Sequence, residues 1–213
     1  MDLFKNTLYI NLKERTDRKT HIEEEFRKMS IQGERVDAIR NKVGAIGCSL
    51  SHIKCLELAK ERNYEYVFIC EDDISFEDPE VFKTNLNKFA SNKQINWDVL
   101  VVGGNTVPPY HHLNDYCIRI FYSQTTTGYV LKKEMYDVFI RNFKESVNKL
   151  IQNPNQTRLY SLDIYWKKMQ PQYFWYMIIP PTVFQYESYS DIENRTVNYK
   201  PLMMDLEKKW LKR

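Results

Sequence analysis

Short apolar runs, rich in β-branched and aromatic residues, alternate along this chain with longer segments whose apolar residues recur with helical spacing. The short runs predict strands at 7–11, 35–39, 65–70, 97–102, 117–122, 128–131 and 174–179. The longer segments predict helices at 16–28, 79–90, 134–151 and 163–169. A further helix is predicted to begin near 44–47 and to end at 62. Because strands that alternate with helices pack as a parallel sheet, we expect an α/β fold with a mainly parallel sheet flanked by helices.

The segments between these elements are predicted to be turns and loops. Gly103-Gly104 is expected to form a turn, and the stretch 105–115, which contains His111-His112, is expected to form a loop. We interpret the basic end, 207–213, as a helical tail, with an anionic membrane or an acidic partner as the alternative. The 213 residues suffice for one α/β domain with its own core, so we expect a single domain spanning 1–213.

The composition argues against several classes of protein. A hydrophobic content of 43% and a charged content of 28% are typical of soluble globular proteins. The net charge of +3 is small and the Lys and Arg residues are interleaved with acids, so we expect no nucleic-acid partner. The 4 cysteines form no CxxC pair and are predicted to be buried free thiols rather than zinc ligands. The polar N-terminus predicts no signal peptide, and with no integral membrane segment expected we predict a cytoplasmic protein.

Polar residues follow several of the predicted strands. Asn11, Asp37, the acids Glu71 to Asp73 and Gly103 all lie just past a strand end. In an open α/β sheet, ligands bind at the carboxyl ends of the parallel strands. We therefore expect these residues to converge on one site.

Glu71-Asp72-Asp73 directly follows the buried strand predicted at 65–70. A solvated turn or a helix cap would explain three such acids without any function. In an extended backbone, however, Glu71 and Asp73 would point to the same side. Two carboxylates so placed can hold Mg²⁺ or Mn²⁺, which neutralises charge on a departing nucleoside diphosphate.

Two longer motifs carry a resemblance to a known family. They are Gly44-Ala-Ile-Gly-Cys-Ser-Leu-Ser-His52 and Tyr66-Val-Phe-Ile-Cys-Glu-Asp-Asp-Ile74. Shorter matches follow the same order at 9–18, 97–100, 127–131, 162–163, 185 and 190–192. Together they resemble glycosyltransferase family 25, which contains bacterial lipooligosaccharide galactosyltransferases and collagen hydroxylysine galactosyltransferases. The chain departs from the family at 36–41, where the family often has a glycine after an Ala-Val-Asp element.

The resemblance implies a GT-A-type nucleotide-binding fold and a metal-dependent enzyme. The expected reaction moves a hexose from a UDP-sugar to a hydroxyl acceptor, with inversion at the anomeric carbon and Mn²⁺ or Mg²⁺ as cofactor. Galactose is the first expectation for the sugar and glucose the second. The acceptor would be a glycan, a lipooligosaccharide or a collagen-like protein.

The resemblance also implies roles for individual residues. Asp73 would coordinate the metal, and Glu71 would contact the ribose or the metal with its water shell, beside Asp72. The residues expected near the nucleotide are Asn11, Arg15 and Arg18, with Asp37 beside the uridine.

Four further residues are implied at the sugar end of the site. Ser51 and His52 would approach the diphosphate or the sugar, although a histidine in a helix is otherwise more often a satisfied structural residue. Asp163 would be the base that takes the proton from the acceptor hydroxyl. The alternative for Asp163 is an N-cap of the helix at 163–169. Gln185 is expected to contact the metal or the sugar.

Two other functions stay open at this point. The same fold could serve as an inactive module that binds a nucleotide sugar or a glycan. The acids could instead belong to a different metal-dependent nucleotide enzyme, such as a nucleotidyltransferase or a phosphohydrolase, although the sequence shows no convincing set of further acidic or lysine partners for one.

Overall fold

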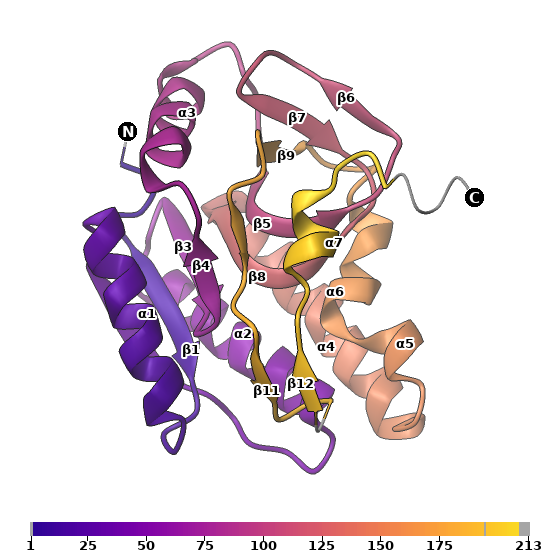
Figure 1. Ribbon diagram of the computed structural model, residues 1–213. Helices are drawn as coiled ribbons and strands as arrows, with labels where there is room; N and C mark the ends of the chain where they lie inside the picture. The colour runs from indigo at the N-terminus through magenta and orange to yellow at the C-terminus, as the bar shows by residue number, and fades with distance from the viewer. Residues whose placement is uncertain (1, 194, 209–213) are drawn as a thin grey trace.

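The computed structural model describes residues 2–193 and 195–208, and its centre is a sheet covered by helices (Figure 1). The strands of this sheet are β1 (Thr7–Asn11), β2 (Gly33–Asp37), β3 (Tyr66–Glu71), β5 (Val99–Thr106), β6 (Tyr110–His112), β7 (Cys117–Ile120), β8 (Ser123–Lys132) and β9 (Trp175–Ile178). Within the described residues they form one 8-stranded sheet in the order β2-β1-β3-β8-β5-β9-β7-β6.

Most strands of this sheet run in one direction. β1 is parallel to β2 and β3, and β5 is parallel to β9. β8 lies antiparallel between β3 and β5, and β7 lies antiparallel between β9 and β6. Among the described strands only β7 and β8 therefore oppose the rest, and the predicted mainly parallel sheet flanked by helices is confirmed.

Helices cover both faces of the sheet. The longer helices are α1 (Thr16–Met29), α2 (Gly44–Glu61), α3 (Pro79–Ser91) and α4 (Tyr136–Gln152). The shorter ones are α5 (Thr157–Tyr160), α6 (Leu162–Tyr165), α7 (Lys200–Met204) and the 3₁₀ turns η1 (Lys133–Met135) and η2 (Trp166–Met169).

The sheet separates two hydrophobic cores. Successive residues of a strand point to opposite faces. Val67 and Ile69 accordingly pack in one core with α2 and α4, whereas Phe68 and Cys70 pack in the other with α1 and α3. Burial on both faces explains why β3 reads as an unbroken apolar run in the sequence.

Several predictions for the segment 97–132 are wrong. The chain does not turn at Gly103-Gly104, because β5 continues to Thr106 with register shifts against β8. The predicted loop at 105–115 contains the end of β5 and all of β6, in which His111 pairs with Arg119 of β7. β8 begins at Ser123, well before the predicted 128, so the threonines at 125–127 belong to the strand. These strand ends are polar, and only pairing with distant strands makes them regular.

Smaller differences concern element ends. β2 spans Gly33–Asp37 rather than 35–39, and the predicted helix at 163–169 divides into α6 and η2. Two small sheets were not predicted, namely β10 (Val183–Gln185) with β4 (Ile74–Phe76), and β11 (Ser188–Ser190) with β12 (Arg195–Val197). Of the helical tail predicted at 207–213, residues 209–213 lie outside the described residues, and residues 207–208 are not helical.

Two sequence expectations concern cysteines and membranes. Cys55, Cys70 and Cys117 are buried free thiols as predicted, whereas Cys48 is only partly buried. In the described part of the chain, each helix is too short or too polar to cross a membrane.

Candidate active site

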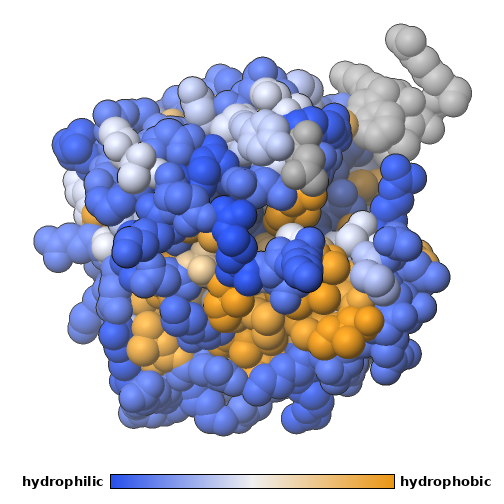
Figure 2. All heavy atoms as spheres, turned by 90° about the horizontal axis from the view of Figure 1, so that it is seen from below, coloured by the Kyte–Doolittle hydropathy of each residue, from blue (hydrophilic) through white to orange (hydrophobic). Residues whose placement is uncertain are grey.

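A cavity of about 990 Å³ opens where β1 and β3 end. Its lining also includes residues of the 38–43 loop, α2, β5, β8, α5, α6, β10, α7 and the β11–β12 hairpin. Figure 2 views the molecule from below the orientation of Figure 1 and shows an apolar area across the middle of this face, bordered by hydrophilic side chains. Ile39 and Ile192, which are 36% and 48% exposed, lie in the cavity lining.

The cavity brings together nearly all the residues predicted for the site. The predicted residues in its lining are Asn11, Arg15, Arg18, Ser51, His52, Glu71, Asp72, Asp73, Asp163 and Gln185. Asp37 is not part of the lining among the described residues; its side chain is 65% exposed and pairs with Arg35 at 2.7 Å. Proximity of these residues is therefore observed, whereas their roles stay predictions.

The three consecutive acids point in different directions. Glu71 is the last residue of β3, and Asp72 and Asp73 form a turn before β4. The expectation of an extended backbone through Asp73 is therefore wrong. The turn arises because β4 leaves the sheet to pair with β10. The three carboxylates therefore have partly different partners around the cavity, with Arg18 shared by Asp72 and Asp73.

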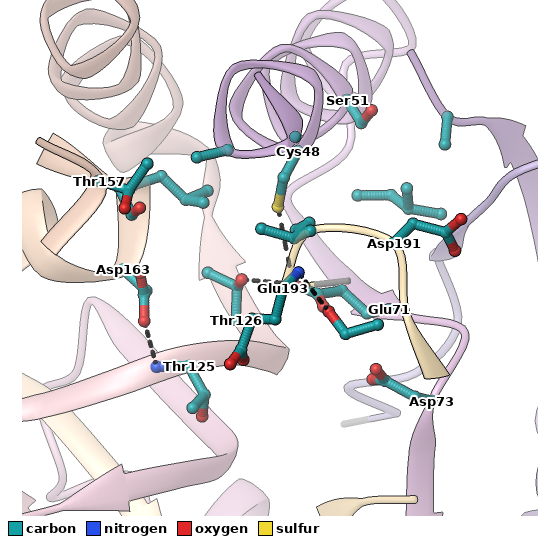
Figure 3. A pocket seen from close by; sticks show the side chains of 18 of the residues that line it. Cys48, Ser51, Glu71, Asp73, Thr125, Thr126, Thr157, Asp163, Asp191 and Glu193 are labelled. Carbon is teal, nitrogen blue, oxygen red and sulfur yellow. Dashed lines mark hydrogen bonds between the residues drawn. The ribbon is translucent and has the colours of Figure 1, made fainter. Parts of the chain in front are cut away.

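Glu71 lies at the end of a buried polar chain. His52 is fully buried, with Nδ1 3.0 Å from the Tyr129 hydroxyl and Nε2 3.3 Å from Glu71 Oε1. Thr126 Oγ1 also donates to Glu71 Oε1, as Figure 3 shows. Burial raises the pKa of Glu71, but the contacts of His52 and Thr126 outweigh it and hold the pKa below its usual range. Glu71 is therefore an ionised carboxylate at neutral pH.

Asp72 connects β1, α1 and β3. Asn11 Nδ2 donates to Asp72 Oδ2 at 2.7 Å, and Arg18 Nη1 donates to Asp72 Oδ1 at 2.9 Å. This contact follows from strand register, because Ile10 pairs with Glu71 and so brings Asn11 beside Asp72. Arg35 in turn donates to Asn11 Oδ1 at 2.9 Å. Asp72 thus has a structural set of partners, although burial raises its pKa.

Asp73 is the least neutralised of the three acids. Arg18 Nη1 lies 3.1 Å from Asp73 Oδ2 but is shared with Asp72, and Gln185 Nε2 lies 3.5 Å from Asp73 Oδ1. Burial, together with the charges of Glu71 and Asp72, raises the pKa of Asp73 to about 7. A cation would relieve this carboxylate, and its oxygens are the ligands that Mg²⁺ and Mn²⁺ prefer. The acids therefore fit the predicted divalent metal.

Glu71 also belongs to a second set of possible ligands. One ligand atom each from Cys48, His52 and Glu71 lies within 4.8 Å of the others. Cys48 Sγ is 4.0 Å from Glu71 Oε1, and burial raises the pKa of this thiol well above its usual value. A sulfur and a nitrogen ligand favour softer metals such as zinc over Mg²⁺. The sequence did not predict that Cys48 would lie in such a cluster.

Asp163 faces the same cavity from α6. Its Oδ2 accepts a hydrogen bond from the backbone N–H of Thr125 at 3.1 Å, as Figure 3 shows. The helix begins at Leu162 with Ser161 as N-cap, so the alternative reading of Asp163 as the N-cap is wrong. Burial raises the pKa of the Asp163 carboxyl. A partly buried carboxylate with a raised pKa suits a general base.

Arg15 and Ser51 also have well-defined partners. Arg15 Nη1 donates to Asp191 at 2.7 Å and Arg15 Nη2 donates to Asp17 at 2.7 Å, so this arginine ties α1 to the β11–β12 hairpin. Ser51 Oγ accepts from the N–H of Ile39 at 2.8 Å and donates to the carbonyl oxygen of Gly47 at 2.7 Å. In this structure Ser51 therefore holds the loop between β2 and α2.

Other lining residues were missed from the sequence. They include Cys48, Asn105, Gln124, Thr125, Thr126, Asp191 and Glu193. The threonine run at 125–127 was a possible signal, but nothing in its sequence indicates that it lies near the start of a strand beside Glu71. Asp191 and Glu193 reach the cavity only because the hairpin folds back over the strand ends.

Comparisons with known proteins agree with the predicted family. Residues 42–118 match glycosyltransferase family 25, described as LPS biosynthesis protein. A putative glycosyltransferase of Haemophilus influenzae is 37% identical over 30% of this chain and 31% of its own length. Procollagen galactosyltransferase 2 of Homo sapiens is 26% identical over 62% of this chain and 26% of its own. The chain thus spans a third or less of the relatives' length, and the predicted resemblance to family 25 is confirmed.

A solved structure supports the fold. The crystal structure of a glycosyltransferase involved in the glycosylation of the major capsid of PBCV-1 superposes with a TM-score of 0.52. The superposition covers 95% of this chain and 89% of the chain of that glycosyltransferase, and the two sequences are 12% identical. The similarity therefore supports the fold and not the activity.

Proposed function

We propose that this relative of glycosyltransferase family 25 transfers a hexose from a UDP-sugar to a hydroxyl group, with residues 1–213 acting as one catalytic domain. Galactose is the first candidate sugar and glucose the second. The acceptor is a hydroxyl of a glycan, a lipooligosaccharide or a collagen-like protein. The family description and the name of the human relative support these acceptor classes.

The observation that carries the proposal is the convergence of carboxylates and arginines in one cavity. Glu71, Asp73 and Asp163 line it together with Arg15 and Arg18. Arginine binds phosphate oxygens through paired N–H donors. The two guanidinium groups would therefore hold the diphosphate of the donor, and the carboxylates would stand beside the sugar and the metal.

Two of the acids would also bind the metal cofactor. Asp73 would hold Mn²⁺ or Mg²⁺, with Glu71 beside it as an ionised second carboxylate. When bound, the metal supplies positive charge that stabilises the departing diphosphate. His52 and Thr126 orient Glu71, and Gln185 orients Asp73.

Asp163 is the proposed base. One of its oxygens accepts the Thr125 N–H, and the carboxylate keeps a second oxygen for the acceptor. That oxygen would take the proton of the acceptor hydroxyl while the hydroxyl oxygen attacks the anomeric carbon from the face opposite the diphosphate. The bond between the anomeric carbon and the diphosphate oxygen would break at the same time, and UDP would leave. Direct displacement from the opposite face inverts the configuration of that carbon.

Calorimetric titration with UDP, in Mn²⁺ and then in excess chelator, tests the donor site. We expect UDP to bind in Mn²⁺, to lose at least about tenfold in affinity with chelator, and to lose the metal dependence in Asp73→Ala. A folded wild-type protein that binds UDP equally well with and without metal would contradict the assignment of Asp73. Binding without any sugar turnover would favour the inactive binding module.

Substitution of Asp163 tests the base. Asparagine can still accept the Thr125 N–H but cannot take a proton, so Asp163→Asn should keep UDP affinity and lose about 100-fold or more in turnover. Turnover is measured as UDP release from UDP-galactose and UDP-glucose. Unchanged turnover in a folded Asp163→Asn protein would leave Asp163 with only its structural contact to Thr125.

A further inference from the structure

The geometry points to a subsite for the hydroxyl groups of the transferred hexose, formed by Asn105, Gln124 and Thr125 next to Asp163. The inference rests on the proposed function, because it assigns the sugar end of the same donor. The residues come from the paired ends of β5 and β8, which the sequence did not predict as strand.

An irregular strand pair places these residues. Asn105 of β5 is the partner of Gln124 of β8, and the β5–β8 register shifts on both sides of Gly103 just before this pair. Side chains directly opposite each other on an antiparallel pair lie on the same face. Bulges of this kind redirect side chains and are frequent beside active sites. All three residues line the cavity.

The polar atoms of these residues are poorly satisfied within the protein. Among the described residues, the buried Asn105 Oδ1 and Thr125 Oγ1 have no hydrogen-bond partner. Lys167 Nζ donates to Gln124 Oε1 at 2.6 Å. Because this contact occupies the amide oxygen, the amide nitrogen of Gln124 can donate a hydrogen bond to a ligand. Buried polar atoms without partners are uncommon and call for an explanation. A sugar hydroxyl both donates and accepts, so a ring with adjacent hydroxyls would satisfy all three side chains after small rotations.

Thr125 also has an unusual backbone. Its φ is 74°, a left-handed conformation that β-branched residues rarely adopt. Asp163 maintains it by accepting the Thr125 N–H at 3.1 Å. Such conformations cluster at ligand sites, where surrounding contacts impose them. The strain therefore marks Thr125 as positioned for a ligand rather than for local stability.

The location and charge of the subsite favour the donor hexose. Thr126, the next residue after Thr125, donates to Glu71, so the subsite adjoins the acids of the proposed metal site. The cation beside it, Lys167, is engaged by Gln124 and lies 4.2 Å from the centre of the Tyr122 ring. The subsite thus presents neutral polar groups that suit hydroxyls, whereas Arg15 and Arg18 lie with the acids at the β1 and β3 ends.

The test compares the affinity for UDP with that for UDP-galactose, UDP-glucose and UDP-N-acetylglucosamine, by calorimetry in Mn²⁺. The variants are Asn105→Ala and Thr125→Gly. We expect the wild-type protein to bind at least one of these donors more tightly than UDP. Each variant should lose about tenfold of that donor's affinity while its affinity for UDP stays within about twofold.

Asn63→Gly is the matched control, because Asn63 also has a positive φ, 56°, but lies after α2 and outside the cavity lining. It should leave both affinities unchanged. A thermal melt shows whether each variant is folded, and Thr125→Gly should melt no lower than the wild type because glycine adopts this φ freely.

Two results would overturn the subsite. The first is a wild-type protein that binds all three donors no more tightly than UDP. The second is that both variants are folded and still bind the UDP-sugar as much more tightly than UDP as the wild type does. The same conclusion would follow if both variants lost affinity for UDP and for the UDP-sugar equally. Failure of the proposed function looks different, since the wild-type protein would then bind neither UDP nor any of the donors.

Discussion

Asp73 is a buried carboxylate whose negative charge is only partly balanced. Arg18, which it shares with Asp72, and a long hydrogen bond from Gln185 are its partners. Glu71, two residues earlier, is partly buried and has direct contacts from His52 and Thr126. The two pKa values consequently move apart, to about 7 for Asp73 and below the usual range for Glu71. Neighbouring acids with different protonation behaviour are typical of functional sites.

The free energy of unfolding of the metal-free protein should depend on the protonation of Asp73. Because burial raises the pKa of Asp73 from 3.8 to about 7, the folded state binds a proton that the unfolded state releases. Asp73 therefore lowers stability as the pH rises from about 4 to about 7. Asp73→Asn, which carries no charge, should be more stable than the wild type by about 1–3 kcal/mol at about pH 8 and nearly equal at about pH 4.

Urea unfolding of both proteins in chelator measures the difference. Other titrating groups cancel in this comparison, apart from those that touch Asp73. A difference that is the same at both pH values would show that Asp73 is ionised throughout and that its pKa is not raised.

At the scale of elements, α2 shapes the cavity by holding the loop before it. Ser51 accepts the Ile39 N–H, and the space beside Gly47 is filled by the same loop. A Cβ at Gly47 would lie 2.4 Å from the carbonyl oxygen of Ile39, which is closer than atoms can approach. Glycine is thus required here by backbone packing and not by its own φ.

Gly47→Ala should displace the 38–41 loop. We expect overpacking to lower the free energy of unfolding by about 1–3 kcal/mol. We also expect UDP to bind more weakly, because the 38–41 loop lines the cavity. Hydrogen exchange of the loop amides and urea unfolding measure the two effects. Glu61→Ala, exposed at the far end of the same helix, is the control and should change neither. An alanine variant with a protected loop and normal stability would show that the loop adapts without cost.

At the scale of the whole molecule, the cavity joins segments that are far apart in the sequence. β1, α2, β3, β8, α6 and the β11–β12 hairpin all contribute lining residues. Figure 1 shows the hairpin in front of the sheet, with α2 and α4 behind it. A ligand that bridges these segments would stabilise the folded chain as a unit, since the unfolded chain has no such site.

Manganese should therefore raise Tm in a pH-dependent way. At about 100 times Kd, a single-site ligand adds about 2.7 kcal/mol, or a Tm increase of about 5–10 °C for a chain of this size. Because the cation must displace the Asp73 proton, the increase should be larger at about pH 8 than at about pH 6. Thermal melts at both pH values measure it, and Asp73→Ala should abolish most of it. An equal increase in Asp73→Ala would locate the metal at other residues, such as Cys48 and His52.

The sequence by itself determined the parts of this protein that depend on local patterns. Apolar runs and helical spacing identified β1, β3, α2, α3 and α4, and the two-sided burial followed from the unbroken apolar strands. The position of Glu71 to Asp73 directly after β3 was likewise enough to predict a cluster of acids at one edge of the sheet.

The tertiary structure decided what depends on distant partners. Pairing with β5 makes the polar segment around Thr125 part of a strand, and the β4–β10 pair bends the chain at Asp72 and Asp73. The same long-range contacts bring Asp191 beside Arg15 and Asp163 beside Thr125. Local sequence specifies backbone preference and burial, whereas the direction of each functional side chain depends on strands and loops that are remote in the chain.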